Sequence, residues 1–206
     1  MGDTVTVLLA TRSEGKLREL RPLFTAAGIQ VQDLREAGLP PTMDEEAVET
    51  FATFEENALA KARYFQALTG RPVVADDSGL EVAALSGQPG VRSRRWSGRE
   101  DLTGQALDEA NNARLLEALR AIDRPKARYV CAAAYCDGAR EEIALGETSG
   151  TIVRDARGGE GFGYDPYFLS DELGATFGES SREAKEQVSH RGRAFRALLE
   201  RLRAQR

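Results

Sequence analysis

Short apolar runs and one amphipathic segment fill the first fifty residues. Val5 to Ala10 is mostly apolar and predicts a buried strand, and Ile29 to Leu34 predicts a second one. Between them, leucines and a phenylalanine recur at helical spacing, so we expect an amphipathic helix that stops at Gly28. Residues 35–50 contain two prolines and several acids with no clear period, which is typical of a loop.

The next segment carries its own helix-start signal. Thr53 followed by Glu56 forms a capping box, and the helix is expected to run to Gly70. Its predicted buried face consists of Phe54, Ala58, Ala62, Phe65 and Leu68. Pro72 to Ala75 then predicts a short buried strand, and the acidic segment Asp76 to Gly79 is expected to form a turn at its end.

The middle of the chain predicts a loop, a helix and a hairpin. Residues 86–100 are rich in glycine, serine and arginine and are typical of a surface loop. Residues 104–122 predict a helix with inward-facing Leu107, Leu115, Leu116 and Leu119. The segments Tyr129–Tyr135 and Glu142–Val153 flank Asp137-Gly138, which indicates a β-hairpin.

The last third predicts a short strand and a basic helix. A glycine-rich segment, 158–163, precedes the strand, and an amphipathic helix begins near Ser189. The apolar stripe of that helix consists of Phe195, Leu198, Leu199 and Leu202. We see no repeat or linker and expect one domain, residues 1–206. Because strands and helices alternate first and a hairpin follows, the expected fold class is α/β, a mixed β-sheet flanked by helices.

The composition is ordinary for a globular protein. Of the 206 residues, 41% are hydrophobic and 30% are charged, and the net charge of −5 lacks the basic excess that general nucleic-acid binding requires. No apolar run approaches the length of a membrane span. Cys131 and Cys136 are five positions apart in an expected strand, so they face opposite sides and are not expected to pair. We expect a reduced, cytoplasmic protein with no nucleic-acid or membrane partner.

The turn after the first strand is the first candidate for chemistry. Its sequence is Thr11-Arg12-Ser13-Glu14-Gly15-Lys16, and backbone N–H groups at a helix start with a lysine in the first turn favour phosphate binding. The segment lacks the earlier glycine and the following Ser or Thr of a P-loop. The alternative is an ordinary helix start with solvated charges, capped by Ser13.

The second candidate is Asp76-Asp77-Ser78-Gly79. Adjacent side chains of an extended chain point to opposite sides, so one carboxylate is expected to face a cleft while the other supports the turn. A carboxylate after a buried strand suits Mg²⁺, which takes a few carboxylates, several waters and substrate phosphates. Further possible ligands are Glu49, Glu55 and Glu56. The alternatives are a turn without function and glutamates that are merely solvated.

Two later segments complete the candidates. In Gly161-Phe162-Gly163-Tyr164-Asp165-Pro166, glycines allow close backbone approach and two aromatic rings can stack on a planar ligand, unless the loop serves only core packing. In Ser189-His190-Arg191, with Lys185 nearby, side chains can donate hydrogen bonds to a carbonyl or an anion, although a lone histidine is more often structural. The single histidine excludes a multi-histidine metal site, and no nucleophile motif is present.

Taken together, these segments resemble the inosine/xanthosine triphosphate pyrophosphatase family, whose members hydrolyse non-standard purine nucleoside triphosphates. The resemblance extends over nearly the whole chain, and the ordered series of motifs is far more specific than any one motif. The matching segments are Leu9–Thr11 with Gly15–Lys16 and Arg18–Leu20, Thr53–Ala58 with Lys61–Ala62, Ala75–Leu80, Pro89–Val91 with Ser97–Gly98, Gly161–Pro166 and Ser189–Gly192.

The resemblance implies a fold, an activity and a set of site residues. The fold would be a two-lobed single domain with its active site in the cleft. The chain would be a Mg²⁺-dependent homodimer that converts ITP, dITP and XTP to monophosphate and pyrophosphate and so keeps them out of DNA and RNA. Asp77 would be the catalytic base and a metal ligand, with Glu49 and Asp76 as further ligands. The implied substrate-binding residues are Thr11, Arg12, Ser13, Glu14, Gly15 and Lys16 at the triphosphate, Ser78, and Phe162, Gly163, Tyr164, Asp165, Lys185, His190 and Arg191 around the base.

The first motif departs from the family pattern at two positions. The family usually has asparagine where this chain has Ser13, and a small residue where it has Arg12. Serine still donates a hydrogen bond but reaches less far than asparagine. Arg12 is expected to add positive charge near the phosphates.

Base choice is expected to depend on the purine 6-position. Hypoxanthine and xanthine present a keto oxygen to hydrogen-bond donors, whereas adenine presents an amino donor. Rejection of GTP, which shares the keto group, would require close packing beneath the 2-position.

Three other functions fit parts of the pattern. Maf-like pyrophosphatases act on other nucleotides from a similar architecture, although their signature differs. A non-catalytic nucleotide sensor would bind ITP without releasing pyrophosphate. A phosphomonoesterase would release orthophosphate, but the chain has no motif for a phosphoryl-accepting nucleophile.

Overall fold

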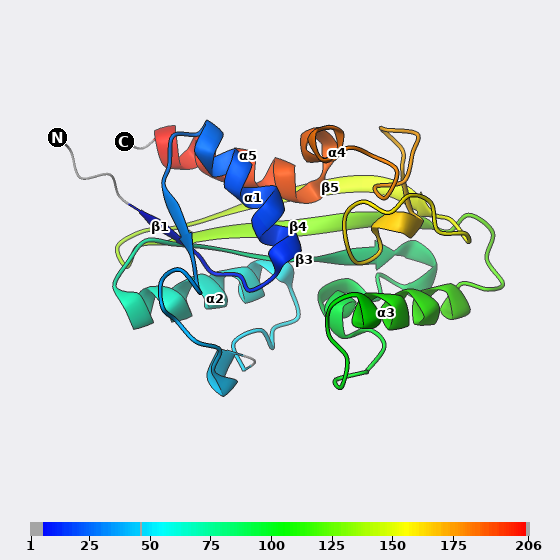
Figure 1. Cartoon of the computed structure of the whole chain (residues 1–206), viewed down its shortest axis with the longest axis horizontal. Coiled ribbons are helices and arrows are strands. Elements are labelled where there is room, and N and C mark those ends of the chain that lie inside the picture. Colours follow the sequence, from blue (N-terminus) through cyan, green and yellow to red (C-terminus); the bar gives the residue numbers. More distant parts are fainter. Residues whose placement is uncertain (1–5, 46, 205–206) are drawn as a thin grey trace. The chain divides into compact units, whose positions relative to one another are not determined.

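The strands of the computed structural model, which describes residues 6–45 and 47–204, form a mixed sheet flanked by helices (Figure 1). The order of the six strands is β2-β1-β3-β4-β5-β6. β1 is parallel to β2 and β3, whereas β6 is antiparallel to β5. The strands are β1 Val7–Leu9, β2 Val31–Asp33, β3 Val73–Val82, β4 Lys126–Cys136, β5 Glu141–Ile152 and β6 Phe168–Ser170. The predicted α/β class and mixed sheet are confirmed.

Five α-helices and four short 3₁₀ turns are present in the described part of the chain. The α-helices are α1 Glu14–Ala26, α2 Phe54–Thr69, α3 Gly104–Ala118, α4 Arg182–Val188 and α5 His190–Ala204. The 3₁₀ turns are η1 Met43–Glu45, η2 Ala83–Leu85, η3 Gly90–Arg95 and η4 Asp165–Tyr167. Within the described ranges, no helix has the length and apolar composition that crossing a membrane requires.

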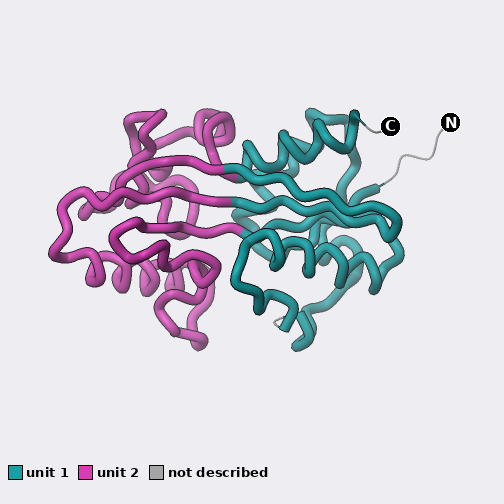
Figure 2. The backbone as a smooth tube through the Cα atoms, turned by 180° about the vertical axis from the view of Figure 1, so that it is seen from behind, with its two compact units in different colours: residues 1–77, 131–146, 191–206 teal, residues 78–130, 147–190 magenta. Residues whose placement is uncertain are grey.

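The chain divides into two compact units, which Figure 2 shows in different colours. Unit 1 comprises residues 1–77, 131–146 and 191–206, and unit 2 comprises residues 78–130 and 147–190. Each unit has its own hydrophobic core. The expectation of two lobes agrees with these units, whereas the single domain over residues 1–206 stays a prediction.

The core of unit 1 lies between its strands and the helices α1 and α5, which cover one face of the sheet while α2 covers the other (Figure 1). Leu20 and Phe24 of α1 meet Phe195 and Leu198 of α5 in this core. Helix α1 begins where the sequence predicts, because Ser13 caps it.

The second helix of unit 1 has the predicted ends. Its N-cap, Thr53, accepts a hydrogen bond from the backbone N–H of Glu56, and Gly70 ends it in the left-handed conformation. Four of the predicted buried residues of α2 are buried, but Leu68 is 57% exposed because it lies outside the stripe that meets the sheet.

The core of unit 2 is aromatic. Tyr129 of β4 packs against Phe168 and Phe177, and Leu115 and Leu119 of α3 complete the cluster. The predicted hairpin of β4 and β5 and the predicted short strand β6 are both present.

The acidic segment is the main correction to the predicted elements. The expected strand over 72–75 does not end before Asp76; it continues as β3 to Val82, so residues 76–79 are extended rather than a turn. Extension is favoured because side chains of neighbouring helices bind both carboxylates, which removes the need for a local turn to satisfy them. Two smaller differences are the separate helix α4 before α5 and the 3₁₀ turn η3 inside the predicted loop 86–100.

Candidate active site

The turn after β1 presents a lysine to the strand beside it. Ser13 accepts a hydrogen bond from the backbone N–H of Lys16 at 3.4 Å, which places Lys16 in the first turn of α1. The ammonium of Lys16 lies 3.0 Å from Oδ2 of Asp76. Ser13 is therefore a helix cap, as the simpler interpretation expected, and the turn also delivers a cation to the carboxylates of β3.

Asp76 is a fully enclosed carboxylate held by two cations. It is 1% exposed. Its Oδ2 accepts a hydrogen bond from Nε of Arg191 at 3.2 Å and forms an ion pair with Lys16. Burial alone would raise the pKa of Asp76, but Lys16, Arg191 and Lys61 outweigh it and hold the pKa well below its ordinary value. Asp76 therefore stays ionised and orients its two partners.

Asp77 has the opposite electrostatic character. It is 8% exposed, and its Oδ2 accepts a hydrogen bond from the side-chain amide of Asn57 at 3.0 Å. Burial and the negative charge of Glu49 together raise the pKa of Asp77 to about 6, against the lowering effect of Lys16 and Lys61. Because the two adjacent carboxylates bind helices on different faces of the sheet, the strand separates a structural anion from a carboxylate that can gain and lose a proton near neutral pH.

Helix α2 supplies two functional side chains whose roles were missed in the sequence. Asn57 and Lys61 lie one turn apart, and Lys61 donates to the backbone carbonyl of Asp76 at 2.9 Å while it forms an ion pair with Glu49. Burial lowers the pKa of Lys61, but Glu49 and Asp76 raise it more, so the lysine stays charged. The signal for these roles in the sequence was the presence of polar residues next to the buried apolar positions of the helix, because buried polar groups need partners.

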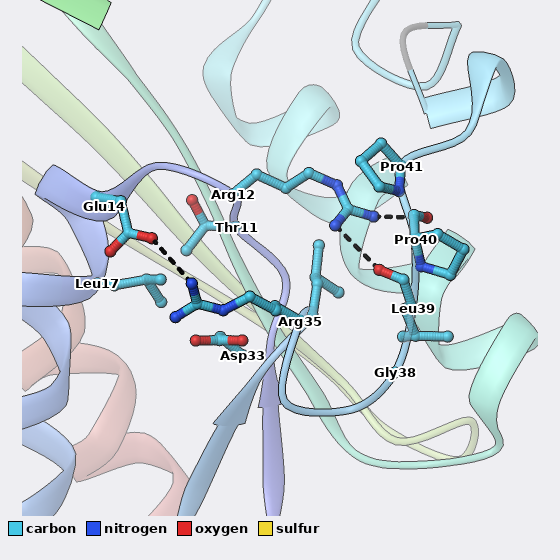
Figure 3. Close-up of a pocket in the computed structure, with 11 residues that line it drawn as sticks. Thr11, Arg12, Glu14, Leu17, Asp33, Arg35, Gly38, Leu39, Pro40 and Pro41 are labelled. Atoms are coloured by element: carbon cyan, nitrogen blue, oxygen red, sulfur yellow. Dashed lines mark hydrogen bonds and ion pairs between the residues drawn. The ribbon is translucent and has the colours of Figure 1, made fainter.

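Arg12 reaches toward Leu39 and Pro40 (Figure 3). Its guanidinium donates to the carbonyls of Leu39 and Pro40 at 3.0 and 2.9 Å and forms a two-pronged ion pair with Glu45. These contacts place its charge against the 39–45 segment, and a role of Arg12 at the phosphates stays a prediction. Arg35, at the same pocket, lies 4.0 Å from Glu14.

Arg12, Glu14 and Arg35 border a cavity of about 570 Å³ in unit 1 (Figure 3). Its lining includes the turn at the start of α1 and the end of β2. Its lining residues are Thr11, Arg12, Glu14, Leu17, Asp33, Leu34, Arg35, Gly38, Leu39, Pro40 and Pro41.

The carboxylates of unit 1 fit a hard cation that brings its own ligands. No cluster of three or more His, Cys, Asp or Glu side chains suited to a metal occurs in the ranges 6–45 and 47–204. Mg²⁺ does not need one, because it usually binds one or two carboxylates and completes its shell with water and phosphate oxygens. Asp77 and Glu49 fit this pattern, since the negative charge of Glu49 disfavours ionisation of Asp77 and a cation would relieve that repulsion. Asp76 fits it less well because Lys16 and Arg191 occupy it.

Unit 2 holds a second group of predicted site residues around a buried ion pair. Lys185 donates to Oδ2 of Asp165 at 2.6 Å, and both residues are almost completely buried. The same oxygen accepts the backbone N–H of Phe162 at 2.8 Å, and the Lys185 ammonium lies 5.3 Å from the centre of the Phe162 ring. Asp165 thus fixes both the lysine and the glycine-rich loop.

The two neighbouring residues His190 and Arg191 belong to different groups. His190 stacks on Tyr129, with ring centres 4.5 Å apart, and Tyr129 in turn lies 3.4 Å from Asp165. Arg191 instead belongs to unit 1, where it binds Asp76 and pairs with Glu19. The grouping of Arg191 with Lys185 and His190 around the base stays a prediction. Glu19, which holds Arg191, had no role in the sequence interpretation.

The remaining candidates are less informative. Ser78 is partly buried within β3, and Tyr164 is buried and donates its hydroxyl to the carbonyl of Ser93 at 2.7 Å. Cys131 and Cys136 are free and buried, as expected. Burial raises the pKa of the Cys131 thiol, which is consistent with the absence of cysteine chemistry.

Comparison with known proteins identifies the family. The model of the Ham1 family matches residues 7–201. The chain belongs to the Ham1 family. Among solved structures, a HAM1 protein from Coxiella burnetii superposes with a TM-score of 0.82 at 35% identity, over 97% of this chain and 99% of that one. The Ham1 protein of Staphylococcus aureus gives a TM-score of 0.80 at 33% identity, covering 98% and 100%.

Relatives of this Ham1 chain have named activities. A protein of Frankia alni called dITP/XTP pyrophosphatase is 50% identical over 96% of both chains. A protein of the same name from Mycobacterium bovis is 46% identical over 99% of this chain and 98% of the relative. The predicted resemblance to the inosine/xanthosine triphosphate pyrophosphatase family is thereby confirmed.

Proposed function

We propose that this protein hydrolyses the non-standard purine nucleoside triphosphates ITP, dITP and XTP to the monophosphate and pyrophosphate, with Mg²⁺ as cofactor. The activity would remove these nucleotides before polymerases insert them into DNA and RNA. The names of the relatives support the substrate class, and the observation that carries the reaction is Asp77. It is a buried carboxylate with a pKa near 6, beside two lysines.

The lysines of unit 1 prepare the phosphates for attack. A triphosphate carries several negative charges, which repel water and the catalytic carboxylate until cations neutralise them. Lys16 comes from α1 and Lys61 from α2, and both are held against Asp76. Asp77 and Glu49 would hold Mg²⁺, which supplies further positive charge to phosphate oxygens and to the attacking water when it is bound.

Asp77 is the proposed general base. Its carboxylate accepts a proton from water as the water oxygen attacks the phosphorus nearest the sugar, and the bond from that phosphorus to the bridging oxygen breaks. The electron pair leaves with pyrophosphate. A pKa near 6 suits this role, because the carboxylate is ionised at neutral pH yet still basic enough to take the proton.

The donors of unit 2 account for the choice of base. Lys185 and His190 carry side-chain N–H donors, and the ion pair with Asp165 holds the Lys185 ammonium 5.3 Å from the centre of the Phe162 ring. A 6-keto oxygen can accept from these donors, whereas the amino group of adenine leaves them without a partner. The loss of such bonds can lower kcat/KM by as much as ~10⁴-fold.

Product analysis tests this function. Purified protein with Mg²⁺ is given ITP, XTP, GTP or ATP, and nucleotides and pyrophosphate are measured separately. We expect monophosphate and pyrophosphate from ITP and XTP and little from GTP or ATP. Orthophosphate with a diphosphate would indicate another phosphohydrolase, and ITP binding without turnover would indicate a sensor.

A matched pair of variants tests the base. Asp77→Asn keeps the shape but cannot take a proton, so turnover should fall by at least about a hundredfold. Asp101→Asn makes the same chemical change at an exposed ion pair with Arg99 and should leave turnover unchanged. Near-wild-type turnover of Asp77→Asn would overturn the assignment.

The family also leads us to propose that the protein is a homodimer and that it works in the cytoplasm. The two free, buried cysteines are compatible with a reducing compartment. Fractionation of the cells that produce the protein tests the location. Absence of the protein from the cytoplasmic fraction would contradict the proposed cytoplasmic location.

A further inference from the structure

The inward face of α3 is unusually polar. Asp108, Asn111 and Asn112 lie between the buried Leu107 and Leu115, where a core-facing helix would normally carry apolar residues. Asn111 and Asn112 are 3% and 7% exposed. Buried polar side chains persist only when they are hydrogen-bonded, so the partners of these residues show what the face is for.

Two of these side chains form hydrogen bonds with the backbone of the same glycine. The backbone N–H of Gly163 donates to Oδ2 of Asp108 at 2.8 Å, and the carbonyl of Gly163 accepts from the side-chain amide of Asn112 at 2.9 Å. Residues 108 and 112 are one helical turn apart, so one face of α3 holds both ends of the same residue. Gly163 has a φ of +64°, a conformation that the chain adopts readily only at glycine.

The loop around that glycine is fixed from two further sides. Asp165 accepts from the backbone N–H of Phe162, and a Cβ on Gly161 would lie 2.1 Å from Oδ2 of Asp165, so the loop packs closely against this carboxylate. Tyr164 donates to the carbonyl of Ser93 at 2.7 Å. Asn111 braces the same 3₁₀ segment, because it binds the backbone N–H of Ser97 and the carbonyl of Arg94.

We propose that Asp108 and Asn112 are positioning residues that set base selectivity by clamping Gly163. The proposal rests on the function proposed above, in which the Phe162–Asp165 loop faces the purine. A rigid loop excludes GTP because its extra 2-amino group collides with the loop. A loop that is no longer held by α3 can move and accommodate that group. Both residues belong to unit 2, whereas the carboxylates proposed for the phosphate chemistry belong to unit 1.

Asn112 has a feature that allows a clean test. Its Oδ1 is buried and has no hydrogen-bond partner within the described residues. Leucine has the same branching and number of side-chain heavy atoms, and it removes both this orphan acceptor and the bond to Gly163. Asn112→Leu should therefore fold normally, because it removes an unsatisfied buried group, and the carbonyl of Gly163, a partly exposed residue, can bond to water instead.

The experiment compares four variants with the full-length wild-type protein. Asp108→Ala and Asn112→Leu each remove one half of the clamp, whereas Asp108→Asn keeps an oxygen that accepts from Gly163. Glu109→Ala changes the adjacent, exposed acid, whose partner is Gln105 on the same helix. The readouts are kcat and KM for ITP and GTP, and hydrogen exchange of the peptide spanning residues 158–165.

We expect Asp108→Ala and Asn112→Leu to lower the ratio of kcat/KM for ITP to that for GTP about tenfold, the size of a loosened shape contact. Exchange in residues 158–165 should quicken in both, while Asp108→Asn and Glu109→Ala stay close to wild type. An unchanged ratio, or equal losses for the two nucleotides, would overturn the proposal. If the wild type hydrolyses no purine nucleotide, the proposed function fails, and unchanged exchange in the variants would separately show that the clamp does not exist.

Discussion

Asp77 illustrates how a single residue combines reactivity with an energetic cost. Its burial disfavours the charged form, and this is why its pKa is near 6 rather than at the ordinary value of 3.8. The native state thus binds a proton more tightly than the unfolded chain does. The contribution of Asp77 to the free energy of unfolding therefore falls as the pH rises from about 4 to about 6, because the unfolded state loses its proton first.

This linkage predicts a pH-dependent stabilisation by Asp77→Asn in metal-free buffer. Asparagine never ionises, so the variant should gain stability over the wild type as the pH rises, by about 2 kcal/mol at pH 8 relative to pH 4. Urea unfolding with a chelator present measures the difference. A difference that is constant with pH would contradict the raised pKa of Asp77.

Asp101→Asn is the control for this prediction. Asp101 is exposed, and its hydrogen bonds with Arg99 lower its pKa to about 2, below the window of the experiment. Its replacement should produce no trend between pH 4 and pH 8.

At the scale of elements, Arg12 connects the turn before α1 to the segment 39–45. Its four hydrogen bonds all go to that segment, whose continuation carries Glu49 to Lys61. We interpret Arg12 as a brace for the loop that presents Glu49, rather than as a phosphate ligand. A lysine has a single charged nitrogen and could not make this fork of bonds.

Arg12→Ala tests the brace. Losing these partly exposed bonds should lower the free energy of unfolding by about 1 kcal/mol, quicken hydrogen exchange in residues 38–49 and raise the Mg²⁺ concentration needed for half-maximal activity. Arg35→Ala, at the same pocket but with an 80% exposed side chain, is the matched control and should change none of these. A higher KM for nucleotide with unchanged exchange in 38–49 would mean that Arg12 binds phosphate directly.

The elements themselves were largely predictable because their signals are local. The capping box at Thr53, the left-handed Gly70 and the Asp137-Gly138 turn act over a few residues, and the structure contains all three. The continuation of β3 through Asp76 was not predictable, because two adjacent aspartates favour a turn unless distant cations bind them.

At the scale of the whole molecule, each unit contains its own core and its own group of candidate residues. Unit 1 brings together the lysines and carboxylates proposed for phosphate chemistry, and unit 2 brings together the aromatic rings, Lys185 and Asp165 proposed for base recognition. A change to one group is thus expected to affect one part of the reaction.

The proposed homodimer is the prediction that belongs to this scale. Sedimentation velocity at micromolar concentration should give a mass twice that of one chain, because Ham1 family resemblance implies two copies. A single species with the mass of one chain, together with full activity, would contradict it.

The sequence by itself determined the order of helices and strands, the caps that bound them, and the motifs that identify the Ham1 family, since all of these depend on neighbours a few residues apart. Only the tertiary structure decided which partner each charged side chain has. Arg191 binds an aspartate 115 positions away, Arg12 binds the carbonyl of Leu39, 27 positions away, and Asp108 of α3 binds Gly163, 55 positions away. The physical reason is that an ion pair forms where desolvated charges meet in space, and spacing along a single chain does not specify that meeting.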